Sequence, residues 1–156
     1  MRVITFNTQG IVQAADRGFF DWMVKQDADV VCLQNIRARE YQLDDSRYHP
    51  EGYEAYFFEA FDDDYSGVAI YTRHLPKAIM TGLGFEQCDF QGRYIQADFE
   101  RFSVGSFNVP SGLKGPEEQA EKDKFIEQFE SHFEKTLRKR REFIFAGSMK
   151  IAHKPV

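Results

Sequence analysis

The segment from Val30 to Ala38, VVCLQNIRA, begins as an apolar run and ends in polar residues. In α/β enzymes, the residues that follow a buried strand are a common place for chemistry. Asn35 occupies a position where a carboxylate would be able to bind a divalent cation, but its amide carries no charge. Mg²⁺ prefers charged oxygen ligands and is usually held through one or two carboxylates. The segment therefore indicates either a neutral position in a working site or a site that has lost its metal.

The elements around this segment are predicted from hydrophobic periodicity. Arg2 to Asn7 alternates in the manner of a strand, and Asp29 to Gln34 is a short apolar run typical of a buried strand. Between them, Ala14 to Gln26 carries apolar residues at helical spacing. This strand–helix–strand order predicts that the first two strands are parallel and adjacent.

The middle of the chain predicts short strands in a mostly antiparallel arrangement. Gly, Pro and Asp separate these segments, and a hairpin is expected near Glu100 and Arg101. A long helix is predicted over Glu117 to Lys139, with one apolar stripe. The strand candidates are Gly52 to Phe58, Gly67 to Arg73, Lys77 to Leu83, Arg93 to Phe99, Ser103 to Val109 and Glu142 to Ala146, and the stripe residues are Phe125, Phe129, Phe133 and Leu137.

Length and composition favour one ordinary globular domain over residues 1–156. The chain has 42% hydrophobic and 29% charged residues. Its net charge of −5 means that contact with nucleic acid would need a local basic patch. We expect Cys32 to be a buried thiol, with no metal-ligand spacing to Cys88. The N-terminus lacks the apolar run of a signal peptide, no segment approaches membrane-spanning length, and we expect a cytoplasmic protein.

Six segments occur in an order that resembles a known family. They are MRVITFNTQGI, GFFDWMVKQDADVVCLQNIRA, SGVAIYTR, GRYIQADF, NVPSG and IFAGSMKIAHK. Together they resemble the exonuclease III branch of the endonuclease/exonuclease/phosphatase superfamily, over essentially the whole chain. The resemblance implies a four-layered α/β sandwich, of which this chain would be the N-terminal part. It also implies Mg²⁺-dependent hydrolysis of phosphodiesters, notably at abasic sites in DNA.

The catalytic positions of that family are only partly kept here. Asn7 matches the family's asparagine, but Asn35 stands in place of a metal-binding glutamate and Asn108 in place of a tyrosine. Ser148 and Lys150 replace the aspartate and asparagine of the motif that orients the attacking water. A serine cannot act as a carboxylate base, and a lysine would repel Mg²⁺. Asn7 is either a retained phosphate or metal contact or a strand-end residue bonded to neighbouring backbone.

These substitutions predict that the chain is not an enzyme and has no catalytic residue, metal site or cofactor. Within the superfamily, the residues resemble the catabolite repression control (Crc) group, carried by LQNIRA, GLGFE, GRYIQADF, VPSG and RKRREFIFAGSMKIAH. That resemblance implies a post-transcriptional corepressor that acts with the Sm-like RNA chaperone Hfq on A-rich messenger RNA. The alternative is an active Mg²⁺-dependent exodeoxyribonuclease III or abasic endonuclease of DNA repair. A third possibility is a degraded fragment without a function of its own.

Two kinds of surface contact are further candidates. The first is contact with RNA phosphate or an acidic protein through Arg93 and the basic run Arg138, Lys139, Arg140 and Arg141. The alternatives are hairpin packing for Arg93 and a solvated helix end for the run. Tyr41, Tyr48, Tyr53 and Tyr56 would either stack on bases or pack a loop onto the sheet. Because the family domain is longer than this chain, we also expect self-association through an uncovered sheet face.

Overall fold

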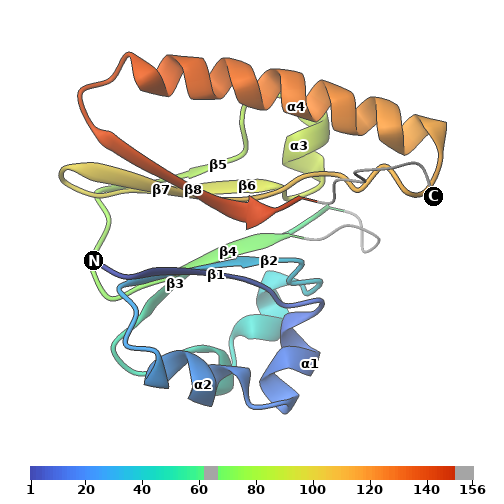
Figure 1. Cartoon of the computed structure of the whole chain (residues 1–156). Coiled ribbons are helices and arrows are strands. Elements are labelled where there is room, and N and C mark those ends of the chain that lie inside the picture. The colour runs from blue at the N-terminus through green and yellow to red at the C-terminus, as the bar shows by residue number, and fades with distance from the viewer. Residues whose placement is uncertain (62–66, 150–156) are drawn as a thin grey trace.

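The computed structural model describes residues 1–61 and 67–149 and consists of two sheets that face each other (Figure 1). Each sheet has four strands, in the orders β1-β2-β4-β3 and β5-β6-β7-β8. The strands are β1 (Val3–Asn7), β2 (Val30–Gln34), β3 (Glu54–Phe58), β4 (Val68–Thr72), β5 (Ala78–Thr81), β6 (Tyr94–Asp98), β7 (Phe102–Asn108) and β8 (Glu142–Ser148). The helices are α1 (Ile11–Asp16), α2 (Phe19–Lys25), α3 (Glu86–Phe90) and α4 (Pro116–Leu137), with 3-10 turns at Glu40–Leu43 and Ser46–Tyr48.

The strand pairing places four strand ends at one end of the sandwich. β1 and β2 are parallel, with Asn7 opposite Gln34, and β7 and β8 are parallel, with Asn108 opposite Ser148. The parallel pairing of the first two strands confirms that prediction. The antiparallel hairpin of β6 and β7 at Glu100 and Arg101 is confirmed as well. The C-terminal ends of β1, β2, β7 and β8 therefore come together, which is where an α/β fold usually holds a ligand.

The apolar residues pack in three clusters, which define four layers. The cluster between the sheets includes Val30, Cys32, Ile70, Ile95 and Val104, all fully buried. A second cluster packs α1 and α2 on the outer face of the first sheet, and a third packs α4 on the outer face of the second (Figure 1). The predicted four-layered α/β sandwich is confirmed.

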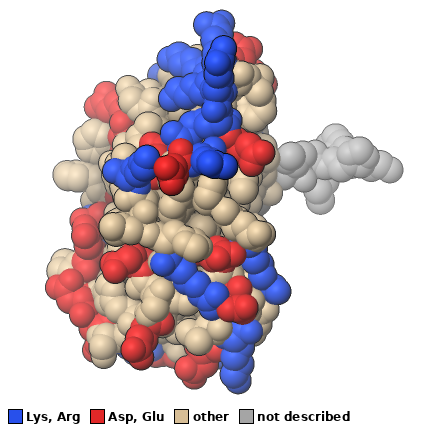
Figure 2. All heavy atoms as spheres, turned by 90° about the vertical axis from the view of Figure 1, so that its left-hand side faces the viewer, with Lys and Arg blue, Asp and Glu red and all other residues tan. Residues whose placement is uncertain are grey.

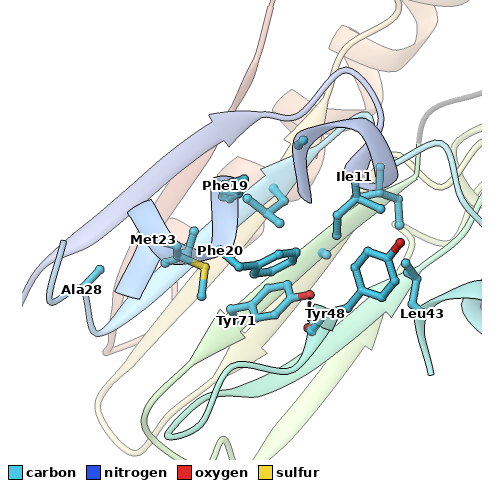
Figure 3. Close-up of a cluster of buried hydrophobic side chains, with 13 residues drawn as sticks. Ile11, Phe19, Phe20, Met23, Ala28, Leu43, Tyr48 and Tyr71 are labelled. Carbon is cyan, nitrogen blue, oxygen red and sulfur yellow. Dashed lines mark hydrogen bonds between the residues drawn. The ribbon is translucent and has the colours of Figure 1, made fainter. Parts of the chain in front are cut away.

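Aromatic side chains fill the cluster under α1 and α2 (Figure 3). Phe20 of α2 contacts the rings of Tyr71 and Tyr48, and the Tyr71 hydroxyl donates to the Tyr48 carbonyl at 2.7 Å. Tyr53 donates its hydroxyl to the carbonyl of Ala28, also at 2.7 Å. Tyr48 and Tyr53 therefore hold loops against the sheet, as the packing alternative stated, while Tyr41 is exposed.

The first predicted helix is two helices. We expected one helix over Ala14 to Gln26, but α1 ends at Asp16 and α2 begins at Phe19. Gly18 lies between them with φ of 87°, a left-handed conformation that glycine adopts without steric cost. The turn rotates α2 so that Phe19, Phe20 and Met23 all reach the core.

Of the predicted stripe on α4, only Phe125 is fully buried, and Phe129 is partly buried. Phe125 is 2% exposed, whereas Phe133 is 42% and Leu137 is 70% exposed. A spacing of four residues advances about 400° around a helix of 3.6 residues per turn, so each step rotates about 40° away from the core. By Leu137 the side chain has left the buried face, and the intervening Thr136 is buried instead.

Both outer sheet faces carry helices, so the expected uncovered sheet face is not found among the described residues. What stays open in residues 1–61 and 67–149 is the sheet edges, including β1 and β8, which lie on the same side of the sandwich (Figure 1). Unpaired edges are themselves sites for pairing with another chain, and self-association stays a prediction.

No helix in the described part of the chain combines the length and apolarity that a bilayer crossing requires.

We predict that both thiols of the folded protein resist thiol reagents. Cys32 and Cys88 are buried and free, and burial raises the pKa of each thiol to about 12. Because the thiolate is the reactive form, reaction with Ellman's reagent at about pH 8 should be slow in buffer and fast in guanidinium chloride. Since both pKa values lie above the ordinary value of 9.0, their contribution to stability should be lost as the pH rises from about 9 towards 12. Rapid reaction without denaturant would contradict this packing.

We also predict that His132 weakens the fold as the pH falls. It lies on α4 against Tyr94, with its Nε2 3.2 Å from the Tyr94 hydroxyl. Burial first, and then the charges of Lys139 and Lys135, lower the pKa of His132 below its ordinary value of 6.5. Its contribution to stability is thus complete above about pH 6.5 and lost below it. Denaturant midpoints at about pH 7 and pH 5 should converge in His132→Gln, and an unchanged difference would contradict the assignment.

Candidate functional site

All three asparagines of the chain meet at the end of the sandwich where β1, β2, β7 and β8 stop. Asn7 ends β1, Asn35 follows β2 directly, and Asn108 ends β7. Ser148, the last residue of β8, lies beside them. We refer to Asn7, Asn35, Asn108 and Ser148 as the amide network. These are four of the five family positions singled out from the sequence, and Lys150 lies outside the described residues.

The amide network is a directional series of hydrogen bonds between the two sheets. Asn108 Nδ2 donates to Asn35 Oδ1 at 3.1 Å, and Asn35 Nδ2 donates to Asn7 Oδ1 at 2.9 Å. Asn7 Nδ2 then donates to Ser148 Oγ at 3.3 Å. The series joins residues up to 141 positions apart in sequence. Asn108 is buried and the other three are partly buried, so the network is accessible from solvent on one side.

The loops that carry the network have an unusual backbone. Gln9, Asn35 and Arg37 have φ of 48°, 54° and 47°, a left-handed conformation that is uncommon for residues other than glycine. Thr8 fastens these loops together, because its hydroxyl donates to the Asn35 carbonyl at 2.8 Å and its amide to the Gln34 carbonyl at 3.0 Å. Strained backbone that surrounding hydrogen bonds hold in place is typical of functional sites.

Gln34, the residue before Asn35, forms a second polar contact between the sheets. Its side chain is 1% exposed and donates to Thr5 Oγ1 at 3.0 Å and to Ser106 Oγ at 3.1 Å. Sequence reasoning did not select Gln34 as a site residue. The available signal was a polar residue at the end of the fully apolar run VVCL, since a buried amide must find partners.

Arg93 lies inside the protein and supports Asn108. Its side chain is 7% exposed, with Nε donating to Gln91 Oε1 at 2.5 Å and Nη1 to the Asn108 carbonyl at 3.1 Å. The backbone N–H of Asn108 in turn donates to the backbone carbonyl of Arg93 at 2.9 Å. The structure thus gives Arg93 the packing role that was the alternative to a surface contact.

The basic run lies at the opposite end of the sandwich from the amide network. Arg138, Lys139 and Arg140 are exposed where α4 ends, and Lys and Arg gather on this face (Figure 2). Arg141 differs, because its guanidinium donates to the Phe99 and Phe102 carbonyls and holds the β6–β7 hairpin. A hollow of about 840 Å³ beside it has mixed charge, lined by Glu100, Arg101, Phe102, Arg140, Arg141 and Glu142. Contact between this run and a partner stays a prediction.

The donor set of the network does not fit a Mg²⁺ site. Its oxygens are amide and hydroxyl oxygens without charge, and Mg²⁺ prefers carboxylates. In residues 1–61 and 67–149, no cluster of three or more His, Cys, Asp or Glu side chains is placed to hold a metal ion. We therefore assign no chemical step to a metal. What the network does offer is an array of preorganised N–H donors, which suits the oxygens of a phosphate.

Fold and site together define an α/β sandwich with a polar site at the C-terminal ends of its strands. The chain belongs to the Endonuclease/Exonuclease/phosphatase family, whose model matches residues 4–149. This result confirms the superfamily inferred from the sequence motifs.

Named relatives include enzymes. An exodeoxyribonuclease of Bacillus subtilis (strain 168) is 27% identical over 157 residues, covering 100% of this chain and 61% of the relative. A DNA-(apurinic or apyrimidinic site) endonuclease of Dictyostelium discoideum is 27% identical, covering 98% of this chain and 42% of the relative. The crystal structure of the Xenopus laevis APE2 catalytic domain has a TM-score of 0.83 and 24% identity, covers 99% of this chain and 60% of that one, and supports the fold. The chain thus spans about half the length of the curated relatives it matches.

The prediction that the chain is not an enzyme is wrong in the light of these relatives. They are named as nucleases, and they match this chain from end to end. The prediction rested on lost charges at single positions, which says what the site lacks and not what it can still do. The same comparisons give no support to a Crc-type regulator.

We predict that Arg93→Ala lowers the free energy of unfolding by about 3 kcal/mol, since hydrogen bonds to a charged donor contribute about 1.5–3 kcal/mol and their acceptors would be left buried. Arg93→Lys should fall between the wild type and the alanine variant, because it keeps the charge but not the fork of donors. Denaturant unfolding measures both. Arg101→Ala, at an exposed position, is the control and should stay within about 0.5 kcal/mol. An Arg93→Ala effect as small as that of the control would return Arg93 to the surface candidates.

Proposed function

We propose that the chain is part of an enzyme that hydrolyses phosphodiester bonds in DNA, as exodeoxyribonucleases and abasic-site endonucleases do. Family membership supports this proposal, as do the names of two relatives that match nearly the whole of this chain. The observation that carries it is the convergence of all three asparagines on one accessible end of the sheets. The corepressor alternative has no comparable observation in its favour.

In this proposal, the amide network binds and orients the phosphate. Phosphoryl transfer develops charge on the non-bridging oxygens, and fixed N–H donors stabilise that charge without reorganising. Arg93 fixes the backbone of Asn108, and Thr8 fixes the backbone of Asn35. The hydrogen bond from Asn108 Nδ2 to Asn35 Oδ1 then orients the two side chains before a substrate arrives. The net charge of −5 predicts that binding to DNA depends on such local contacts and weakens strongly with salt.

We predict that the purified chain cleaves a labelled duplex with one abasic site, in buffer that contains Mg²⁺ or Mn²⁺. A single incision product would indicate endonuclease activity, and a ladder from a 3′ end would indicate exonuclease activity. Asn108→Ala should lower the cleavage rate roughly tenfold or more, because Asn108 Nδ2 is the donor that orients the Asn35 side chain, and a misplaced group can cost about 100-fold.

Ser131→Ala is the matched control, because Ser131 is exposed on α4 and belongs to neither the amide network nor the basic run. Its cleavage rate should equal that of the wild type. Absence of any product, or equal product from Asn108→Ala, would rule out the proposed activity for this chain.

A further inference from the structure

The hydrogen bonds of the amide network give it a polarity. The carbonyl oxygen of an asparagine side chain has two lone pairs, and its NH₂ group has two donors. Asn7 Oδ1 accepts from Asn35 Nδ2 at 2.9 Å and from the Gln9 amide at 3.1 Å. Both lone pairs of this oxygen are therefore in use. A cation would have to displace a hydrogen bond before it could bind there.

The other two acceptors of the network each receive one hydrogen bond within it. Asn35 Oδ1 accepts from Asn108 Nδ2, and Ser148 Oγ accepts from Asn7 Nδ2. Asn7 and Asn35 each donate one N–H within the network, and within residues 1–61 and 67–149 their second N–H makes no hydrogen bond. Both side chains are only partly buried, so these two N–H groups are donors that a ligand can reach.

We propose that the amide network is an anion site, which binds a phosphate oxygen directly through the N–H groups of Asn7 and Asn35, and that it does not hold a divalent cation. The identification of the anion as a phosphate of nucleic acid rests on the proposed function. Asn35 determines this preference, because it supplies one free donor and also occupies the second lone pair of Asn7 Oδ1.

Substitution of Asn35 by aspartate should reverse the preference. Aspartate has the same shape and also tolerates the left-handed backbone at this position, so the fold should be kept. The change replaces the free donor and the donor to Asn7 Oδ1 by a carboxylate. Phosphate binding should weaken at least about tenfold, and Mn²⁺ binding should strengthen at least about tenfold. Ser131→Asp, at an exposed position on α4, adds the same charge away from the site and should change neither.

Asparagine-selective ¹⁵N labelling makes the test direct. The chain has three asparagines, and all of them belong to the network, so every side-chain NH₂ signal reports on it. In EDTA, inorganic phosphate and a short oligonucleotide should each shift the signals of Asn7 and Asn35. Without EDTA or phosphate, one equivalent of Mn²⁺ should leave the three wild-type signals unbroadened. In Asn35→Asp, the same equivalent should broaden the two signals that remain, those of Asn7 and Asn108.

Site-specific broadening of the wild type by one equivalent of Mn²⁺, or signals that phosphate leaves unmoved, would overturn the anion site. Shifts with inorganic phosphate but not with the oligonucleotide would overturn its assignment to nucleic acid. These results are separate from the cleavage assay. If the chain binds phosphate at Asn7 and Asn35 but cuts no DNA, the anion site stands and the proposed function is wrong. If the chain cuts DNA while its amides bind Mn²⁺, the proposed function stands and the anion site is wrong.

Discussion

The arrangement of this protein depends on how the polar groups at one end of its two sheets satisfy one another. Four strands end there, and each leaves polar backbone and side-chain atoms close to a closed apolar core. A buried polar group without a partner costs about 1–3 kcal/mol, so nearly all of these groups need a hydrogen-bond partner. Thr8 bonds the carbonyls that follow β2, Gln34 bonds across the sheets, and the amide network closes the rim.

These hydrogen bonds couple the site to the fold. Asn7 belongs to the first sheet and Ser148 to the second, so their hydrogen bond holds the sheets in register as well as shaping the site. Residues in one hydrogen-bond network do not contribute independently, because removing one changes the partners of the next. Effects of paired substitutions among Asn7, Asn35 and Asn108 should accordingly differ from the sum of the single ones. The buried Arg93 extends this coupling, since it fixes the backbone of Asn108 at the end of β7.

Periodicity predicted the parts of the fold that follow from local pattern. The β1–β2 pair, the β6–β7 hairpin and the long helix α4 were all expected, because strand and helix periods differ and the turns carry Gly, Pro or charged residues. The break at Gly18 was missed, since the apolar spacing continues through it and only the left-handed backbone shows that the helix stops. The outward rotation of Leu137 was missed because four-residue spacing only approximates the helical period.

The sequence predicted which residues form the site, but it did not predict the hydrogen bonds between them. Asn7, Asn35 and Asn108 were selected one by one from motifs, and the sequence showed that each lacks charge. Nothing in the sequence indicates that Asn108 donates to Asn35 and Asn35 to Asn7, because these contacts join residues 73 and 28 positions apart. Charge alone made the site look inert. Transition states of phosphoryl transfer are stabilised by donors fixed in the right direction, and the proposed function assigns that role to the neutral amides of this network. Under the proposed function, the direction of the hydrogen bonds therefore matters more than the number of carboxylates.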